Sequence, residues 1–197
     1  MGALLPELQT ERLTVRLARP GMQAAMARFL AENYPGHLDK WSPPAAPAFF
    51  TESFWRERLA IAVEEFQAGR AARFVLQLRE TGRGRETPAE LSFPIVGTCN
   101  YTNIVRGPFQ ACHLGYSIDQ RYEGRGLMRE ALGAALGFIF DAYRLHRVMA
   151  SYRPDNARSG RLLENLGFER EGLAKAYLKI DGQWADHVLT SLVNPKD

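Results

Sequence analysis

The chain has 197 residues, 46% of them hydrophobic, which suits one folded domain that needs neither disulfides nor a structural metal. Its two cysteines, Cys99 and Cys112, form no CxxC pair or disulfide framework, so we expect two buried thiols in a reducing cytoplasm. The formal net charge of +3 comes from arginines spread along the chain, which argues against direct nucleic-acid readout and fits attraction to a phosphorylated cofactor.

The N-terminal residues carry no basic segment followed by an apolar core, so no signal peptide is expected. No apolar run approaches the roughly 18 residues of a membrane span, so no membrane association is expected either. Alternating apolar residues then predict an opening strand over residues 10–18, and apolar residues at helical spacing predict a helix from Met22 to near Pro35.

Residues 41–47 (WSPPAAP) are expected to form a loop, because proline interrupts regular structure. Thr51 or Ser53 can cap a second helix that Gly69 closes. Residues 80–94, rich in glycine, proline and charge, are expected to be a flexible connection. Further strands are predicted over residues 73–78, 95–102, 110–118, 147–152, 177–180 and 184–192.

The clearest helix follows Gly126 and carries one apolar stripe from Leu127 to Ala142. Another helix is predicted from Asn156 to Leu166, and Asp181-Gly182 is a preferred pair for the tight turn between the last two strands. The element order β-α-α-β-β-β-α-β-α-β-β therefore indicates a single mixed α/β domain.

Residues 114–128 read LGYSIDQRYEGRGLM, a strand that runs through an Arg-x-x-Gly-Arg-Gly turn into the long helix. Glycines let backbone N–H groups converge, and a helix N-terminus adds free amides and partial positive charge. Arg121 and Arg125 can add full charge for a pyrophosphate. The alternative is that Gly124 and Gly126 only permit a tight connection. Neither the P-loop pattern nor the dinucleotide fingerprint fits this spacing.

This arrangement resembles the GNAT superfamily of acyl-CoA N-acetyltransferases, whose pyrophosphate loop follows Arg/Gln-x-x-Gly-x-Gly. The similarity extends to NARS at 156–159 and LGF at 166–168, and one GNAT domain is expected over residues 10–192. Residues 103–109, 114–128 and 177–188 look most like the RimJ-type enzymes, which acetylate the N-terminal alanine of a small-subunit ribosomal protein. The resemblance implies a mixed, mostly antiparallel sheet flanked by helices, with a splayed central strand pair.

The resemblance also implies acetyl-CoA as co-substrate and no metal. It assigns backbone contacts with the pantetheine arm to Tyr116, Ser117 and Ile118. Asn156 matches a residue that contacts the cofactor, although an asparagine there can equally serve as a helix cap. The residues assigned to the pyrophosphate are Arg121, Tyr122, Glu123, Gly124, Arg125 and Gly126.

The candidate catalytic residues are Ser159 and His113. Ser159 matches a position where related enzymes place a hydroxyl near the CoA sulfur, although serines at helix starts are often structural. His113 is a candidate base because residues 111–114 offer no carboxylate where many relatives have a glutamate; it could instead face solvent or the core. Trp41 and Asn103 are candidate acceptor-binding residues, and Trp41 could instead belong to the core.

We therefore expect a cytoplasmic enzyme, monomeric or homodimeric, that acetylates the N-terminal amine of a protein, with alanine as the expected residue. A terminal α-amine has a pKa of about 7.7–8.0 against about 10.4 for lysine, so it needs only mild help from a base. Two alternatives remain. One is acetylation of a small amine such as a polyamine, amino acid or antibiotic. The other is a non-catalytic acetyl-CoA-binding factor in ribosome assembly.

Overall fold

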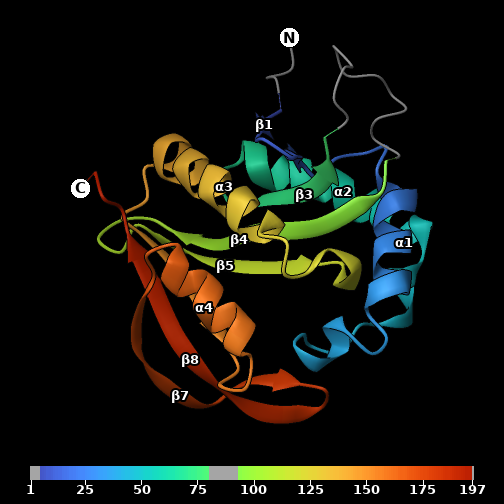
Figure 1. Ribbon diagram of the computed structural model, residues 1–197. Coiled ribbons are helices and arrows are strands. Elements are labelled where there is room, and N and C mark those ends of the chain that lie inside the picture. The colour runs from blue at the N-terminus through green and yellow to red at the C-terminus, as the bar shows by residue number, and fades with distance from the viewer. Residues whose placement is uncertain (1–4, 80–92, 197) are drawn as a thin grey trace.

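The computed structural model of the protein describes residues 5–79 and 93–196 (Figure 1). No helix in these two ranges is long and apolar enough to cross a membrane. The elements, in chain order, are β1 (Glu7–Gln9), β2 (Leu13–Leu17), α1 (Gln23–Asn33), η1 (Leu38–Lys40), η2 (Pro47–Phe50), α2 (Glu52–Gln67), β3 (Ala72–Leu78), β4 (Ile95–Val105), β5 (Ala111–Ile118), η4 (Gln120–Tyr122), α3 (Leu127–Tyr143), β6 (Arg147–Tyr152), α4 (Ala157–Asn165), β7 (Glu169–Ile180) and β8 (Gln183–Val193).

Within the described residues the strands form one eight-stranded sheet in the order β1-β2-β3-β4-β5-β6-β8-β7. Neighbours among these strands run antiparallel, except for the parallel pair β5 and β6. That pairing ends at Leu114 opposite Ala150. Beyond it, β5 continues to Ile118 beside β4, while β6 continues to Tyr152 beside β8. The two central strands therefore splay apart, which confirms the expected fold class.

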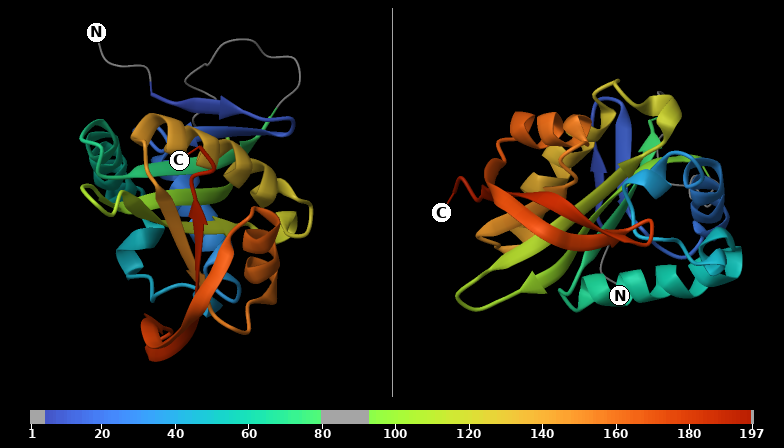
Figure 2. Two further views of the ribbon diagram at one scale, coloured as in Figure 1. Left: turned by 90° about the vertical axis from the view of Figure 1, so that its left-hand side faces the viewer. Right: turned by 90° about the horizontal axis from the view of Figure 1, so that it is seen from below.

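The helices cover both faces of the sheet, with α3 and α4 on one face and α1 and α2 on the other (Figure 2). The apolar stripe of α3 is buried against the strands, as its spacing predicts. A second cluster joins Phe29 of α1 and Leu59 of α2 to Val75 of β3. The sheet is thus the middle layer of three.

Local signals in the sequence are confirmed at two boundaries. Thr51 caps α2, and its hydroxyl accepts a hydrogen bond from the backbone N–H of Phe54. Asp181 and Gly182 have φ angles of 46° and 74° and join β7 to β8 as a two-residue turn. Positive φ at both positions is typical of the tight hairpin turns that match strand twist.

Three expected strand boundaries were wrong. The opening strand begins at Leu13, and the strand expected over residues 95–102 continues to Val105. The strand expected to begin at Tyr177 begins at Glu169, because β8 pairs with a charged segment across two bulges. The short β1 was not expected at all. The connection expected over residues 80–94 lies, apart from its last two residues, outside the described part of the chain.

Candidate active site

The loop that joins β5 to α3, residues 119–126, lies at the open end of the splayed strands. Gly124 and Gly126 have φ angles of 71° and 74°, which L side chains rarely adopt. Apart from its chain neighbours, no described atom lies within 4 Å of where a Cβ would sit at Gly124. Gly126 is the N-cap of α3 and supplies no side chain to the first amides of the helix. These amides and the helix dipole fit a pyrophosphate.

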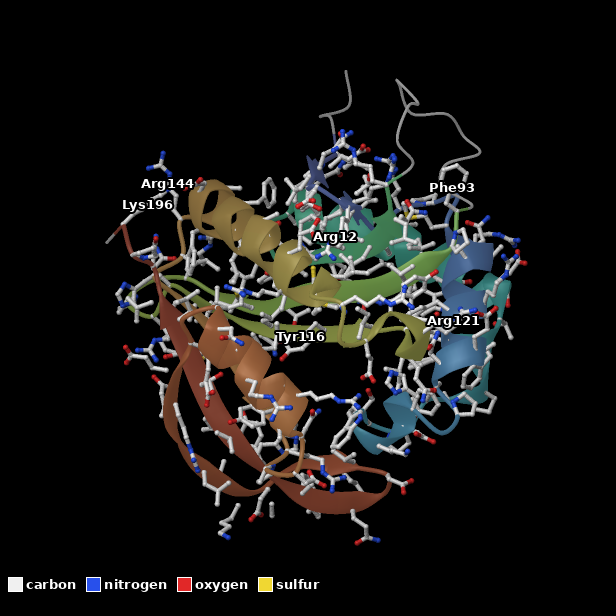
Figure 3. The ribbon with its side chains drawn as sticks, viewed as in Figure 1. Arg12, Phe93, Tyr116, Arg121, Arg144 and Lys196 are labelled. Atoms are coloured by element: carbon white, nitrogen blue, oxygen red, sulfur yellow. The ribbon has the colours of Figure 1, made fainter. Side chains whose placement is uncertain are left out.

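The two arginines of this loop have different surroundings. The guanidinium of Arg121 donates to Asp119 and to Glu32 of α1, at 2.5 Å and 2.7 Å, and lies beside α1 (Figure 3). Burial alone would raise the pKa of Asp119, but hydrogen bonds from Arg121 hold it below its usual value. The guanidinium of Arg125 lies over the ring of Tyr122, 5.3 Å from its centroid. Two carboxylates therefore already balance the charge of Arg121, and Arg125 is the more available cation.

The N-terminus of α4 lies across from the glycine loop, on the other side of the separated strands. Asn156 caps the helix, and its Oδ1 accepts a hydrogen bond of 3.1 Å from the N–H of Ser159. Arg158 in the same turn forms an ion pair with Glu123 of the glycine loop. The cap and the ion pair hold the first turn of α4 beside the loop, so the structure brings Asn156, Ser159 and Glu123 together.

The side chain of Tyr116 faces Ser159 where the free end of β5 meets the first turn of α4, a region called the cleft below. The hydroxyl oxygens of the two residues are 2.7 Å apart, and Tyr116 lies between α3 and α4 (Figure 3). Burial raises the pKa of Tyr116 to about 12, so the phenol keeps its proton at neutral pH. The sequence pattern assigned only the backbone of this residue. Strand alternation could have placed its ring on the face that also carries Leu114, but no sequence signal pointed to Ser159.

His113 and Ser117 lie on the other face of β5. Ser117 pairs with Thr98 on β4, and Thr98 pairs with Val75 on β3. Val75 belongs to the cluster under α1 and α2, so Ser117 lies on the face that these two helices cover. The hydroxyls of Ser117 and Thr98 are 2.9 Å apart. Burial lowers the pKa of His113, and its buried Nδ1 has no hydrogen-bond partner among the described residues. His113 is therefore a neutral imidazole with a free ring nitrogen, on the face opposite to Ser159.

Trp41 packs near the end of β6, where β5 and β6 have separated. The guanidinium of Arg153, just after β6, lies 5.7 Å from its ring centroid and donates to the carbonyl of Lys40. An open groove of about 440 Å³ begins at Arg153 and Asp155 and continues along the tip of the β7–β8 hairpin, where Trp184 is 66% exposed. Trp41 thus belongs to a surface that adjoins the start of α4.

Asn103 does not share this location. It is exposed, with a φ angle of 52°, near the turn that leads into the start of β5. Trp41 lies near the opposite end of the parallel pair, where β6 ends at Tyr152. The structure therefore separates the two candidate acceptor residues along the length of the central strands.

His37, which the sequence patterns did not single out, links the segment before Trp41 to the cofactor side. Its Nε2 donates to the carbonyl of Ile118 at 3.0 Å and lies 4.0 Å from a carboxylate oxygen of Glu123. The resemblance assigned the backbone of Ile118 to the pantetheine arm, and its carbonyl already accepts this hydrogen bond. No motif contains His37, so only the folded arrangement shows this contact.

Comparison with known proteins agrees with this geometry. The acetyltransferase (GNAT) domain family matches residues 12–169. The [ribosomal protein uS5]-alanine N-acetyltransferase of Escherichia coli (strain K12) is 45% identical over 188 residues, which cover 95% of this chain and 91% of that protein.

Two solved structures have the same fold over nearly the whole chain. The ribosomal-protein-S5-alanine acetyltransferase from Vibrio fischeri superimposes with a TM-score of 0.86 at 39% identity, covering 96% of this chain and 97% of that one. Mycobacterium smegmatis RimJ, in complex with CoA-disulfide, superimposes with a TM-score of 0.81 at 28% identity, covering 98% and 88%. With its splayed sheet and its glycine loop before α3, this chain belongs to the GNAT family of acetyltransferases.

Proposed function

We propose that the protein transfers the acetyl group of acetyl-CoA to the N-terminal α-amine of a protein, with a small-subunit ribosomal protein that begins with alanine as the acceptor. The observation that supports this choice of acceptor is the 45% identity, over 95% of this chain, to an enzyme named for the alanine of uS5. A ribosomal acceptor also implies that the reaction takes place in the cytoplasm.

The glycine loop and the splayed strands are suited to acetyl-CoA. In the proposed complex, the amides of residues 121–126 bind the pyrophosphate, and the backbone of residues 116–118 contacts the pantetheine arm. The left-handed glycines and the uncapped start of α3 support this assignment. Asn156 then contacts the cofactor while it caps α4, and the hydroxyl of Ser159 stabilises the departing sulfur.

The acceptor amine approaches, in this proposal, from the face of β5 that carries His113. A terminal α-amine, with a pKa of about 7.7–8.0, is partly neutral at pH 7. A neutral imidazole can take the proton that the amine loses, directly or through water, and the lowered pKa of His113 keeps it neutral. Trp41 and the adjoining groove then contact the residues after the acceptor alanine. Asn103 is too far along the sheet to share that groove.

The test follows CoA release from acetyl-CoA with a short peptide that begins with alanine. Its control is the same peptide with an acetylated N-terminus and an internal lysine, which offers only a side-chain amine. Turnover of the free peptide alone supports the proposal. Turnover of polyamines, amino acids or antibiotics in place of the peptide would retain the chemistry and refute the acceptor. Acetyl-CoA binding without turnover of any amine would refute the enzyme function.

A further inference from the structure

We propose that Tyr116 is a positioning residue for Ser159: its phenol donates a hydrogen bond to Ser159 Oγ and leaves the serine proton directed into the cleft, toward the leaving sulfur. The inference rests on the proposed acetyl transfer. It assigns to this tyrosine side chain a role that its place on β5 alone does not indicate.

The hydrogen bond connects the two walls of the cleft. Tyr116 belongs to the part of β5 that lies beyond the last pairing with β6, and Ser159 belongs to the first turn of α4. The 2.7 Å contact between their oxygens is a short hydrogen bond between residues 43 positions apart. It crosses the opening that the splay creates, so it fixes where the serine oxygen lies relative to the central strand.

The direction of this hydrogen bond decides what Ser159 can do. A serine hydroxyl has one proton, so a serine that donates to Tyr116 has none left for another acceptor. Both hydroxyls keep their protons at neutral pH, and the phenol is the more acidic of the two and therefore the stronger donor, which favours donation from Tyr116 to Ser159. The N–H of Ser159 is already bound to Asn156. With the phenol as the donor, the serine hydroxyl proton is left free for another acceptor.

Tyr152 of β6 supports the same turn from the other strand. A Cβ at Gly160 would lie 2.9 Å from the Tyr152 hydroxyl and 3.0 Å from its ring carbons. Because residue 160 is glycine, the ring of Tyr152 can pack directly against the helix next to Ser159. The splayed strands thus each contribute a tyrosine to the start of α4, and only the one on β5 reaches the serine hydroxyl.

In the transfer step the amine nitrogen forms a bond with the acetyl carbonyl carbon, and the carbon–sulfur bond breaks with its electron pair on sulfur. Ser159 donates a hydrogen bond to that sulfur as its negative charge develops. The proton that the nitrogen loses passes to the base or solvent, and the sulfur takes up one proton from solvent. Tyr116 keeps its own proton throughout.

The experiment is a double-mutant cycle with Tyr116→Phe, Ser159→Ala and the double variant. We expect Tyr116→Phe to lower kcat roughly tenfold, the size of one lost hydrogen bond, while KM and the Kd for acetyl-CoA stay within about twofold. In the Ser159→Ala background the same change should have almost no effect on kcat. The free energies of unfolding of the same unliganded variants, measured in denaturant, give the coupling energy between the two residues independently of turnover.

The matched control is Tyr143→Phe. Tyr143 is buried where Tyr116 is partly buried, also has a pKa raised to about 12, and donates to the carbonyl of Ala71. The kcat of the Tyr143→Phe variant should equal that of the wild type. Equal slowing by Tyr116→Phe with and without Ser159, or a change confined to the Kd for acetyl-CoA, would overturn the tyrosine role alone. The cycle uses whichever amine the wild-type protein acetylates, so an inactive wild type refutes the proposed function instead.

Discussion

At the scale of single residues, Gly124 is the position at which the proposed anion site in the loop after β5 can be tested. Its φ of 71° is strained for any residue with a Cβ, and no described atom other than its chain neighbours would contact that Cβ. We expect Gly124→Ala to lower the free energy of unfolding by about 1–2 kcal/mol, the cost of left-handed backbone. It should also raise the Kd for acetyl-CoA about tenfold or more, since each loss of about 1.4 kcal/mol of binding free energy raises the Kd tenfold. Denaturant unfolding and calorimetric titration measure the two quantities.

Gly107 provides a matched control for this change. It also has a φ of 71° and open space where a methyl group would be added, but it lies in the turn between β4 and β5. Gly107→Ala should therefore cost the same stability and leave acetyl-CoA affinity unchanged. Equal loss of affinity in both variants would show that backbone strain acts through the whole fold, and would remove the anion role of Gly124.

The residues that sequence could identify are those whose role is local. A glycine with positive φ and an asparagine at a helix start act within a few positions of themselves, so their roles follow from short patterns. The contact between Tyr116 and Ser159 and the contact of His37 with Ile118 join distant segments. Such contacts depend on how strands splay and loops fold back, and no short pattern encodes them.

At the scale of elements, the cap of α4 separates a structural role of Asn156 from a ligand-binding one. Asn156→Ala removes the acceptor for the Ser159 N–H and should cost about 1 kcal/mol of stability, whereas Asn156→Asp keeps an acceptor. If the amide group also donates to the cofactor, Asn156→Asp should fold like the wild type and bind acetyl-CoA more weakly. Chemical denaturation and acetyl-CoA titration of both variants test this. Wild-type affinity in Asn156→Asp would leave Asn156 as a cap only.

The strands show where element prediction fails. Helix α3 was predicted correctly because its apolar stripe is set by its own sequence. The first eight of the twelve residues of β7 read EREGLAKA, which is charged and poor in β-branched residues, so nothing in this segment favours a strand. It is extended because β8 offers hydrogen bonds to it, with irregular register at residues 170–172 and 174–178. Pairing with a distant segment thus outweighed local preference.

At the scale of the whole molecule, the sheet order was available only through resemblance. Local patterns predict strands and helices in order, but they do not state that β5 and β6 run parallel and then separate. That separation creates the candidate site, because it frees the end of β5 and leaves it beside α4. The motif around the glycine loop indicated the family, and the family then implied the splay.

The buried thiols make the stability of the whole domain depend on alkaline pH. Cys99 and Cys112 are fully buried in the main core, and burial raises the pKa of each to about 12. An unfolded thiol ionises near pH 8.5, so the raised folded pKa contributes stability that is complete below that pH and is lost as pH rises. Two such groups predict a fall that steepens from about 1.4 kcal/mol per pH unit near pH 8.5 toward about 2.7 kcal/mol per pH unit near pH 10. Urea unfolding at closely spaced pH values measures this slope.

The double variant Cys99→Ala, Cys112→Ala isolates the thiols from other titrating groups. It should be less stable at pH 7, because each change removes a buried sulfur from the core. Its stability should nevertheless fall much less steeply than that of the wild type between roughly pH 8.5 and 9.5, where the unfolded wild type releases thiol protons and the unfolded variant has none to release. Burial also raises the pKa of Tyr101, Tyr116 and Tyr143, so these phenols add a fall of their own in both proteins as the pH approaches 10, where unfolded phenols ionise. An equally steep fall in the variant would mean that groups other than the two buried thiols control alkaline unfolding.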